Sequence, residues 1–165
     1  MAVAMFPALA VIGFIVGTMF WAIMSERIGV TKPIYLVCMV LTGVCGVIVF
    51  YTAPSVTAYL LAFFPGFFIG AGPAIVMMQP LRLPEFGPRY AANATGVLTA
   101  IHHVGGFIFL PYFFTPLWHS AGGLAAALIV WLGSMTVSGL LVLGIPETGR
   151  KARERMGAEA ASHEA

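Results

Sequence analysis

Every charged residue of this chain lies outside five long apolar runs. The runs cover about residues 3–24, 34–51, 56–78, 91–114 and 124–145, and none of them contains Asp, Glu, Lys or Arg. A helix crosses a bilayer with about 20 mostly apolar residues, and runs without apolar–polar alternation predict helices. Only 8% of the residues are charged, which is too few to keep a chain of this size in water. The sequence therefore predicts an all-α integral membrane protein with five transmembrane helices.

The basic residues predict how the chain is oriented. If each run crosses the membrane, all eight Lys and Arg residues fall on one side, and the positive-inside rule makes that side cytoplasmic. We then expect a multi-pass protein of the inner (plasma) membrane with its N-terminus outside, an arrangement typical of a chain that lacks a preceding helix. Residues 1–149 would form the bundle and residues 150–165 a cytoplasmic tail. That tail is either a short helix held by anionic lipid headgroups or a frayed end.

Small residues spaced by four predict where helices pack closely. Lipid supplies no hydrophobic drive between helices, so contact depends on small side chains that let backbones approach. The spacing occurs at Gly13 and Gly17, at Gly66, Gly70 and Ala74, and at Ala92, Gly96 and Ala100.

Three of the prolines inside the runs, Pro65, Pro73 and Pro111, predict kinks, because each removes a backbone donor. Bent helices line the path of many carriers, although a helix that only fills a bundle also tolerates proline.

His102 and His103 lie near the middle of the fourth run, and one of them could line a solute path, with Thr99 one turn earlier. The alternative is a neutral histidine bonded to a neighbouring helix. Adjacent histidines point about 100° apart, so we predict no metal site from them. Cys38 and Cys45 are expected to be apolar fillers, and no cofactor is predicted. Because no acidic or nucleophilic partner lies at depth, we do not expect an enzyme.

Two short motifs carry a family resemblance. Residues 22–32 read Ala-Ile-Met-Ser-Glu-Arg-Ile-Gly-Val-Thr-Lys, within a charged hinge from Ser25 to Pro33. This order resembles the signature of the major facilitator superfamily: Gly, two residues, Ser, Asp, Arg, any residue, Gly, then basic residues. Ala22, Glu26 and the pair at 30–31 depart from it, as is common in the family's second copy between helices eight and nine. Residues 146–150, Pro-Glu-Thr-Gly-Arg, resemble the close of helix twelve. The resemblance implies helices eight to twelve, which are most of a six-helix half-bundle.

The resemblance also implies a cytoplasmic gate. Glu26 would sit at a helix N-terminus that belongs to the absent N-terminal half and would pair with Arg82, and Gly29 would allow a tight turn. The gate residues are then Glu26, Arg27, Gly29, Arg82 and Arg89. The alternative is that these charges only set the topology.

The function implied is transmembrane transport by part of a secondary active transporter for a small solute, with an anion as one candidate. Residues 79–111 look like the corresponding region of cyanate permease and nitrate/nitrite porter relatives, but the first run lacks the arginine that holds nitrate in those porters. We expect the chain to be incomplete alone and to need the N-terminal half of a carrier, or a second copy, in the lipid bilayer. No nucleic acid partner is expected. The alternative is a non-transporting scaffold or subunit that packs against partner helices.

Overall fold

The computed structural model describes residues 2–52, 55–83, 87–119 and 123–163. Within these ranges the chain is helical and has no strand, so the predicted all-α fold is confirmed. In this part of the chain four helical stretches are long and apolar enough to cross a membrane: Pro7–Ile28, Lys32–Thr52, Val56–Ile75 and Gly123–Gly144. The fold is therefore compatible with a membrane protein of several spans.

The predicted fourth span corresponds to α7 (Gly87–Phe109), which is not among these four stretches. At 23 residues α7 is long enough to cross a bilayer, but it is less apolar than the others. Asn93, the two adjacent histidines and several glycines lower its hydropathy. The count of five spans therefore stays a prediction.

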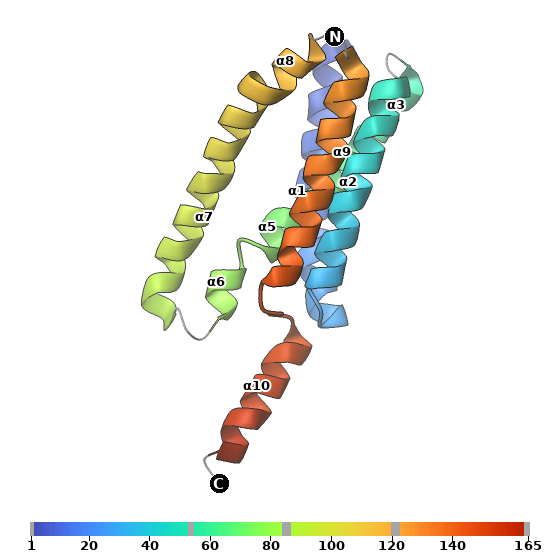
Figure 1. The fold of residues 1–165 in the computed structure, drawn as a ribbon. Helices are drawn as coiled ribbons and strands as arrows, with labels where there is room; N and C mark the ends of the chain where they lie inside the picture. Colours follow the sequence, from blue (N-terminus) through green and yellow to red (C-terminus); the bar gives the residue numbers. More distant parts are fainter. Residues whose placement is uncertain (1, 53–54, 84–86, 120–122, 164–165) are drawn as a thin grey trace.

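The bundle is built from α1 (Ala2–Ile28), α2 (Lys32–Thr52), α9 (Gly123–Leu141) and a third stretch divided into α3 (Val56–Leu61), α4 (Phe63–Ile69) and α5 (Ala71–Ile75). α1 packs on α4, and α2 packs on both α4 and α9. In Figure 1, α7 runs along one side of this group, with the short helices α6 (Gln79–Arg82) and α8 (Thr115–Trp118) at its two ends. The core cluster lies between α2, α5 and the turn that follows α9, and contains Tyr35, Cys38, Met39, Ala71, Ala74, Ile75 and Val142.

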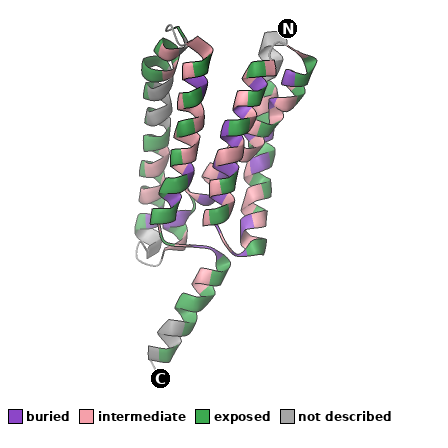
Figure 2. Cartoon of the chain, turned by 45° about the vertical axis from the view of Figure 1, so that its right-hand side comes forward, coloured by how far each residue is buried: buried purple, intermediate pink, exposed green. Residues whose placement is uncertain are grey.

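Large apolar side chains cover much of the outer surface. Met19 on α1 and Ile129 on α9 are 66% and 72% exposed, and Figure 2 shows exposed residues along every helix of the bundle. Exposed apolar surface on this scale is unusual for a protein in water, and it fits helices that face lipid or a partner.

Two of the small-residue ridges meet each other. A Cβ added at Gly13 or Gly17 of α1 would overlap the backbone of α4, and one added at Gly66 would overlap the backbone of Ala10. Trp21 closes the same interface, because its Nε1 donates a hydrogen bond of 3.0 Å to the Phe67 carbonyl oxygen. The close contact predicted for these ridges is present, and it joins the first run to the third.

The third ridge, on α7, does not pack in this way. Ala92, Gly96 and Ala100 are exposed, and a Cβ added at Gly96 would meet nothing within 4 Å. In the described part of the chain α7 packs mainly on α6 and on the turn that follows α7, so this face has no intrachain helix against it. Within the described part of the chain no helix contact is made at this ridge, so the predicted contact stays a prediction.

Interruptions accompany Pro65, Pro73 and Pro111, whereas α1 continues without a break through Pro7. The breaks at Ala62 and Gly70 lie three residues before Pro65 and Pro73, where each proline ring crowds the preceding turn. Pro111 lies in a π-helical turn, Leu110–Phe114, that continues α7.

The hinge is shorter than the sequence predicted. α1 continues through Glu26 and Arg27 to Ile28, and α2 begins at Lys32, so residues 29–31 alone make the turn. Gly29 has φ = 79°, and its N–H donates to the Ser25 carbonyl oxygen at 2.9 Å, a common helix C-terminal cap. After α9 the chain forms a 3₁₀ turn, Val142–Gly144, and then the helix α10 (Arg150–His163), which extends away from the bundle in Figure 1.

Candidate functional site

Three charged side chains meet beside the hinge, and we name Glu26, Arg82 and Arg153 the ion triad. Arg82 Nη2 lies 2.5 Å from Glu26 Oε1, and Arg153 Nη2 donates to Glu26 Oε2 at 2.8 Å. Each arginine thus takes a different carboxylate oxygen, and the triad ties α1 to α6 and α10. The Glu26 side chain is 40% exposed, so solvent weakens both pairs.

The structure places Glu26 in the last turn of α1, where it pairs with Arg82. The helix N-terminus that Glu26 is expected to meet would belong to the other half of a carrier, so that contact stays a prediction. A carboxylate is disfavoured by the dipole at the C-terminal end of α1, and the two arginines offset this. Arg153 was not among the predicted gate residues, because nothing local links positions 127 residues apart. Arg27 is exposed, and the side chain of Arg89 lies outside the described residues.

A second carboxylate fastens the end of the bundle to the start of α2. Glu147 Oε1 accepts from the Thr31 N–H at 2.9 Å and from the Thr31 hydroxyl, while Oε2 accepts from the Lys32 N–H at 3.2 Å. The Gly149 N–H also donates to Oε1, at 2.9 Å. We name Glu147, Thr31 and Lys32 the terminal clasp. The first N–H groups of a helix have no intrahelical acceptor, and the dipole there favours a negative charge, so Glu147 caps α2.

Two further contacts hold the same segments together. Lys32 Nζ donates to the Leu143 carbonyl oxygen at 2.9 Å, and the Lys151 N–H donates to the Gly29 carbonyl oxygen at 3.2 Å. A Cβ added at Gly149 would overlap the backbone of Gly29. The first turn of α10 is therefore bound to the hinge.

The terminal clasp changes the acidity of Glu147. Burial raises the pKa of the carboxyl, but hydrogen bonds from the Thr31 hydroxyl and from the N–H groups of Lys32, Gly149 and Thr31 outweigh it. The pKa therefore lies below the ordinary value of a glutamate, and the ionised form stabilises the fold.

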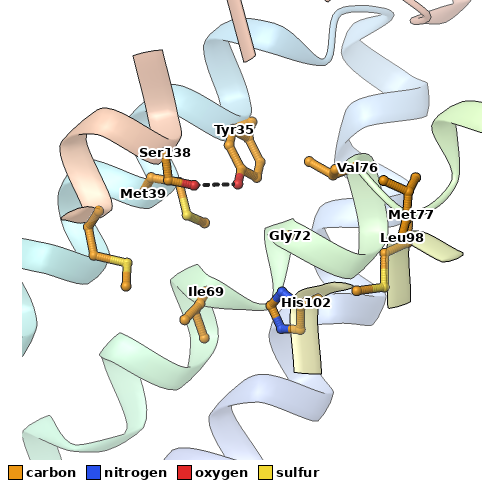
Figure 3. A pocket seen from close by; sticks show the side chains of 10 residues that line it. Tyr35, Met39, Ile69, Gly72, Val76, Met77, Leu98, His102 and Ser138 are labelled. Carbon is orange, nitrogen blue, oxygen red and sulfur yellow. Dashed lines mark hydrogen bonds between the residues drawn. The ribbon is translucent and has the colours of Figure 1, made fainter. Parts of the chain in front are cut away.

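A central cavity of about 170 Å³ lies between α7 and the bundle. Across it from His102, the Tyr35 hydroxyl and Ser138 Oγ lie 3.0 Å apart in a hydrogen bond that joins α2 to α9 (Figure 3). The lining residues come from α2, α4, α5, the turn after α5, α7 and α9: Tyr35, Met39, Ile69, Gly72, Val76, Met77, Leu98, His102, Met135 and Ser138.

Of the predicted path residues, His102 lines this cavity. Thr99 lies one turn earlier on α7 and donates to the Thr95 carbonyl oxygen at 2.8 Å and to Met77 Sδ at 3.7 Å. The side chain of His103 lies outside the described residues. Sequence reasoning missed Tyr35 and Ser138, because a single hydroxyl in an apolar run gives no indication of its partner.

Removing the Tyr35–Ser138 hydrogen bond should cost little stability. We expect Tyr35→Phe and Ser138→Ala to couple by about 0.6 kcal/mol in a double-mutant cycle, the average for such bonds between membrane helices. The free energy of unfolding in mixed micelles measures the coupling. Additive single effects would show that the two hydroxyls do not interact.

Comparisons with models of known protein families, with curated proteins and with solved structures found no match to this chain. Any functional conclusion therefore depends on the residues and their arrangement.

Proposed function

We propose that this chain forms most of the C-terminal half of a major-facilitator-type secondary carrier, equivalent to helices eight to twelve. One observation carries the proposal: two segments that resemble the family's markers bind each other. Glu147, from the Pro-Glu-Thr-Gly segment, accepts hydrogen bonds from Thr31 and Lys32 of the hinge, although Thr31 and Glu147 are 116 residues apart. The resemblance puts both markers at the cytoplasmic face, and contacts between them would hold that face of the carrier together.

The central cavity and α7 support the same proposal. Carriers of this type bind their solute between helices near the middle of the membrane and alternate access by rocking. We take α7 as the fifth span, with the cavity between it and the bundle as one wall of the solute path. The N-terminus then lies outside and α10 in the cytoplasm of an inner (plasma) membrane.

The charge of the cavity lining limits how an anionic solute could be bound. Among the described lining residues there is no Lys or Arg, so an anion would take its counter-charge from the other half of the carrier. The exposed ridge of Ala92, Gly96 and Ala100 offers a close-packing face to a helix of that half or of a second copy.

Transport and pull-down measurements test this function. We expect the chain alone in liposomes to show no saturable uptake of nitrate, nitrite or cyanate, because it supplies one wall of the path. Affinity purification from the source membrane should bring down a six-helix carrier half or a second copy. Saturable uptake by the chain alone would contradict the proposal that the chain needs a second half for transport. A stable partner that is not part of a carrier would favour a scaffold instead.

The ion triad should influence which way the assembled carrier opens. Glu26→Gln weakens both ion pairs of the triad, so we expect the inward-open population to rise about fivefold if 1 kcal/mol is lost. The test uses a Ser138→Cys variant in which Cys38 and Cys45 are replaced. The measurement is the rate at which a thiol reagent, added on the cytoplasmic side, labels the introduced cysteine. Arg155→Gln, at an exposed position of α10 outside the triad, is the matched control. If Glu26→Gln leaves the labelling rate unchanged, the triad has no gating role.

A further inference from the structure

The size of the central cavity limits what it can hold. Its volume is about 170 Å³, which is below the roughly 300 Å³ at which sites for drug-sized ligands begin. It is close in size to an apolar cavity of about 150 Å³ that binds benzene. A Cβ added at Gly72, which lines the cavity from α5, would meet nothing within 4 Å, so no side chain fills the space beside the backbone there. The space therefore suits a molecule of one or two small rings.

The charge of the lining disfavours an ion in this chain. Among the described lining residues there is no Asp, Glu, Lys or Arg, so an ion would lose its water without gaining a counter-charge. The Tyr35 and Ser138 hydroxyls are bonded to each other at 3.0 Å. The hydroxyl that accepts this bond keeps its own hydrogen, which it can donate to a ligand. The pair thus offers one hydrogen-bonding point on a lining that is otherwise mostly apolar.

Thioethers and rings border the cavity from several sides. Met39 lies on the side of α2, while Met77 and His102 lie on the opposite side (Figure 3), and Met135 of α9 is a third thioether in the lining. A thioether attracts an aromatic ring at about 5 Å, often at the ring edge, and this contact requires no coordination geometry. Sulfurs on opposite sides of a cavity therefore suit a ring that lies between them. The Tyr35 ring adds a further aromatic surface.

We propose that the central cavity binds a small uncharged aromatic molecule with one polar group, of the size of phenol or indole. The ring lies between the thioethers, and its polar group meets the hydroxyl pair of Tyr35 and Ser138. The Thr99 hydroxyl, which donates to Met77 Sδ at 3.7 Å, helps to hold the Met77 side chain at the cavity wall. The role of such a molecule as the transported solute rests on the proposed function, whereas its binding to this chain does not.

Fluorine NMR of para-fluorophenol tests the binding. The full-length chain is reconstituted in lipid nanodiscs, and empty nanodiscs measure how much of the probe enters the lipid. We expect saturable binding to the chain that phenol displaces. Cyclohexanol has nearly the same size without the aromatic ring and should displace the probe about two- to tenfold less well. Benzoate carries a charge that the lining cannot balance and should not displace it.

Substitution of the thioethers tests the residues of the site. Met39→Leu, Met77→Leu and Met135→Leu should each weaken binding of the probe by about two- to tenfold. Leucine keeps nearly the same volume, so the bundle should tolerate these changes. Met78→Leu, next to Met77 but outside the lining, is the matched control and should bind the probe as the unchanged chain does.

Removal of both hydroxyls separates the polar contact from the fit of the ring. Tyr35→Phe combined with Ser138→Ala should weaken binding of para-fluorophenol by about two- to tenfold, the usual worth of one hydrogen bond. Binding of fluorobenzene, which has no hydroxyl, should stay unchanged in the same variant. A change in the shape or folding of the cavity would alter the binding of both molecules, so the difference between them reports the hydrogen bond itself.

The outcomes that overturn the inference are distinct from those that contradict the proposed function. Absence of saturable binding would overturn the site. Cyclohexanol that competes as well as phenol, or unchanged binding in all three Met→Leu variants, would overturn the aromatic class. An assembled carrier that takes up a charged solute, while the chain does not bind the probe, would overturn this inference alone. Binding of the probe by a chain whose partner is not a carrier half would support the site and contradict the proposed function.

Discussion

Gly66→Ala should destabilise the bundle by about 1–3 kcal/mol, the usual cost of extra atoms in a filled contact. The added methyl would overlap the carbonyl of Ala10 on α1, and that atom belongs to a helix backbone, which cannot rotate away as a side chain could. The helices would have to separate, and the neighbouring contact of Gly17 with Phe67 would loosen as well. The measurement is the free energy of unfolding in mixed micelles, followed by circular dichroism.

Gly133→Ala on α9 is the matched control for Gly66→Ala. A Cβ added at Gly133 would meet nothing within 4 Å, so this substitution should be neutral or stabilising by up to about 1 kcal/mol through helix propensity. The same chemical change is thus expected to have opposite signs at the two positions. Equal effects would show that α1 and α4 are not in close contact.

Glu147→Gln should lower the free energy of unfolding by about 2 kcal/mol or more. The carboxylate accepts from the Thr31 N–H and hydroxyl and from the N–H groups of Lys32 and Gly149, and bonds to a charged acceptor are each worth about 1.5–3 kcal/mol. Glutamine offers one acceptor oxygen and turns its NH₂ group toward a donor. It also removes the negative charge from the N-terminus of α2.

The pH dependence of unfolding should identify the same carboxylate. The pKa of Glu147 is lowered in the folded state, so its contribution is fully present above the ordinary glutamate value of about 4.3 and is lost as the pH falls through the lower folded value. The difference between the unchanged chain and Glu147→Gln should shrink over that acidic range. Glu154→Gln is the control, because Glu154 pairs with Arg150 on exposed α10 at 3.6 Å and such a pair is worth at most about 1 kcal/mol. A constant difference at every pH would reject the capping role.

Much of the helical structure follows from local residues. The uncharged runs became helices, the breaks in the third run accompany Pro65 and Pro73, and Gly29 makes the turn between α1 and α2. These features depend on hydrogen bonds and steric contacts within about one helical turn, which the neighbouring residues decide. The extent of the hinge was overestimated, because charged residues such as Glu26 and Arg27 continue a helix as readily as they end it.

The same small-residue spacing had two different outcomes. Gly66 and Gly70 lie against α1, whereas Gly96 is open, although the two ridges look alike in the sequence. Such a ridge permits a close approach of two helices, but it does not determine which helix packs against it. The contacts of Glu147 with Thr31 and of Arg153 with Glu26 could not be predicted from the sequence, because each contact joins residues more than a hundred positions apart.

The sequence by itself determined that this chain is all-helical and apolar enough for a membrane, and that a turn falls at Gly29 and breaks fall near Pro65 and Pro73. The tertiary structure alone decided that Glu147 caps α2, that α1 packs on α4, and that three methionines and His102 border one cavity. The reason is physical: a helix forms from hydrogen bonds between near neighbours in the chain, whereas caps, interfaces and cavities depend on how separate helices are placed against one another.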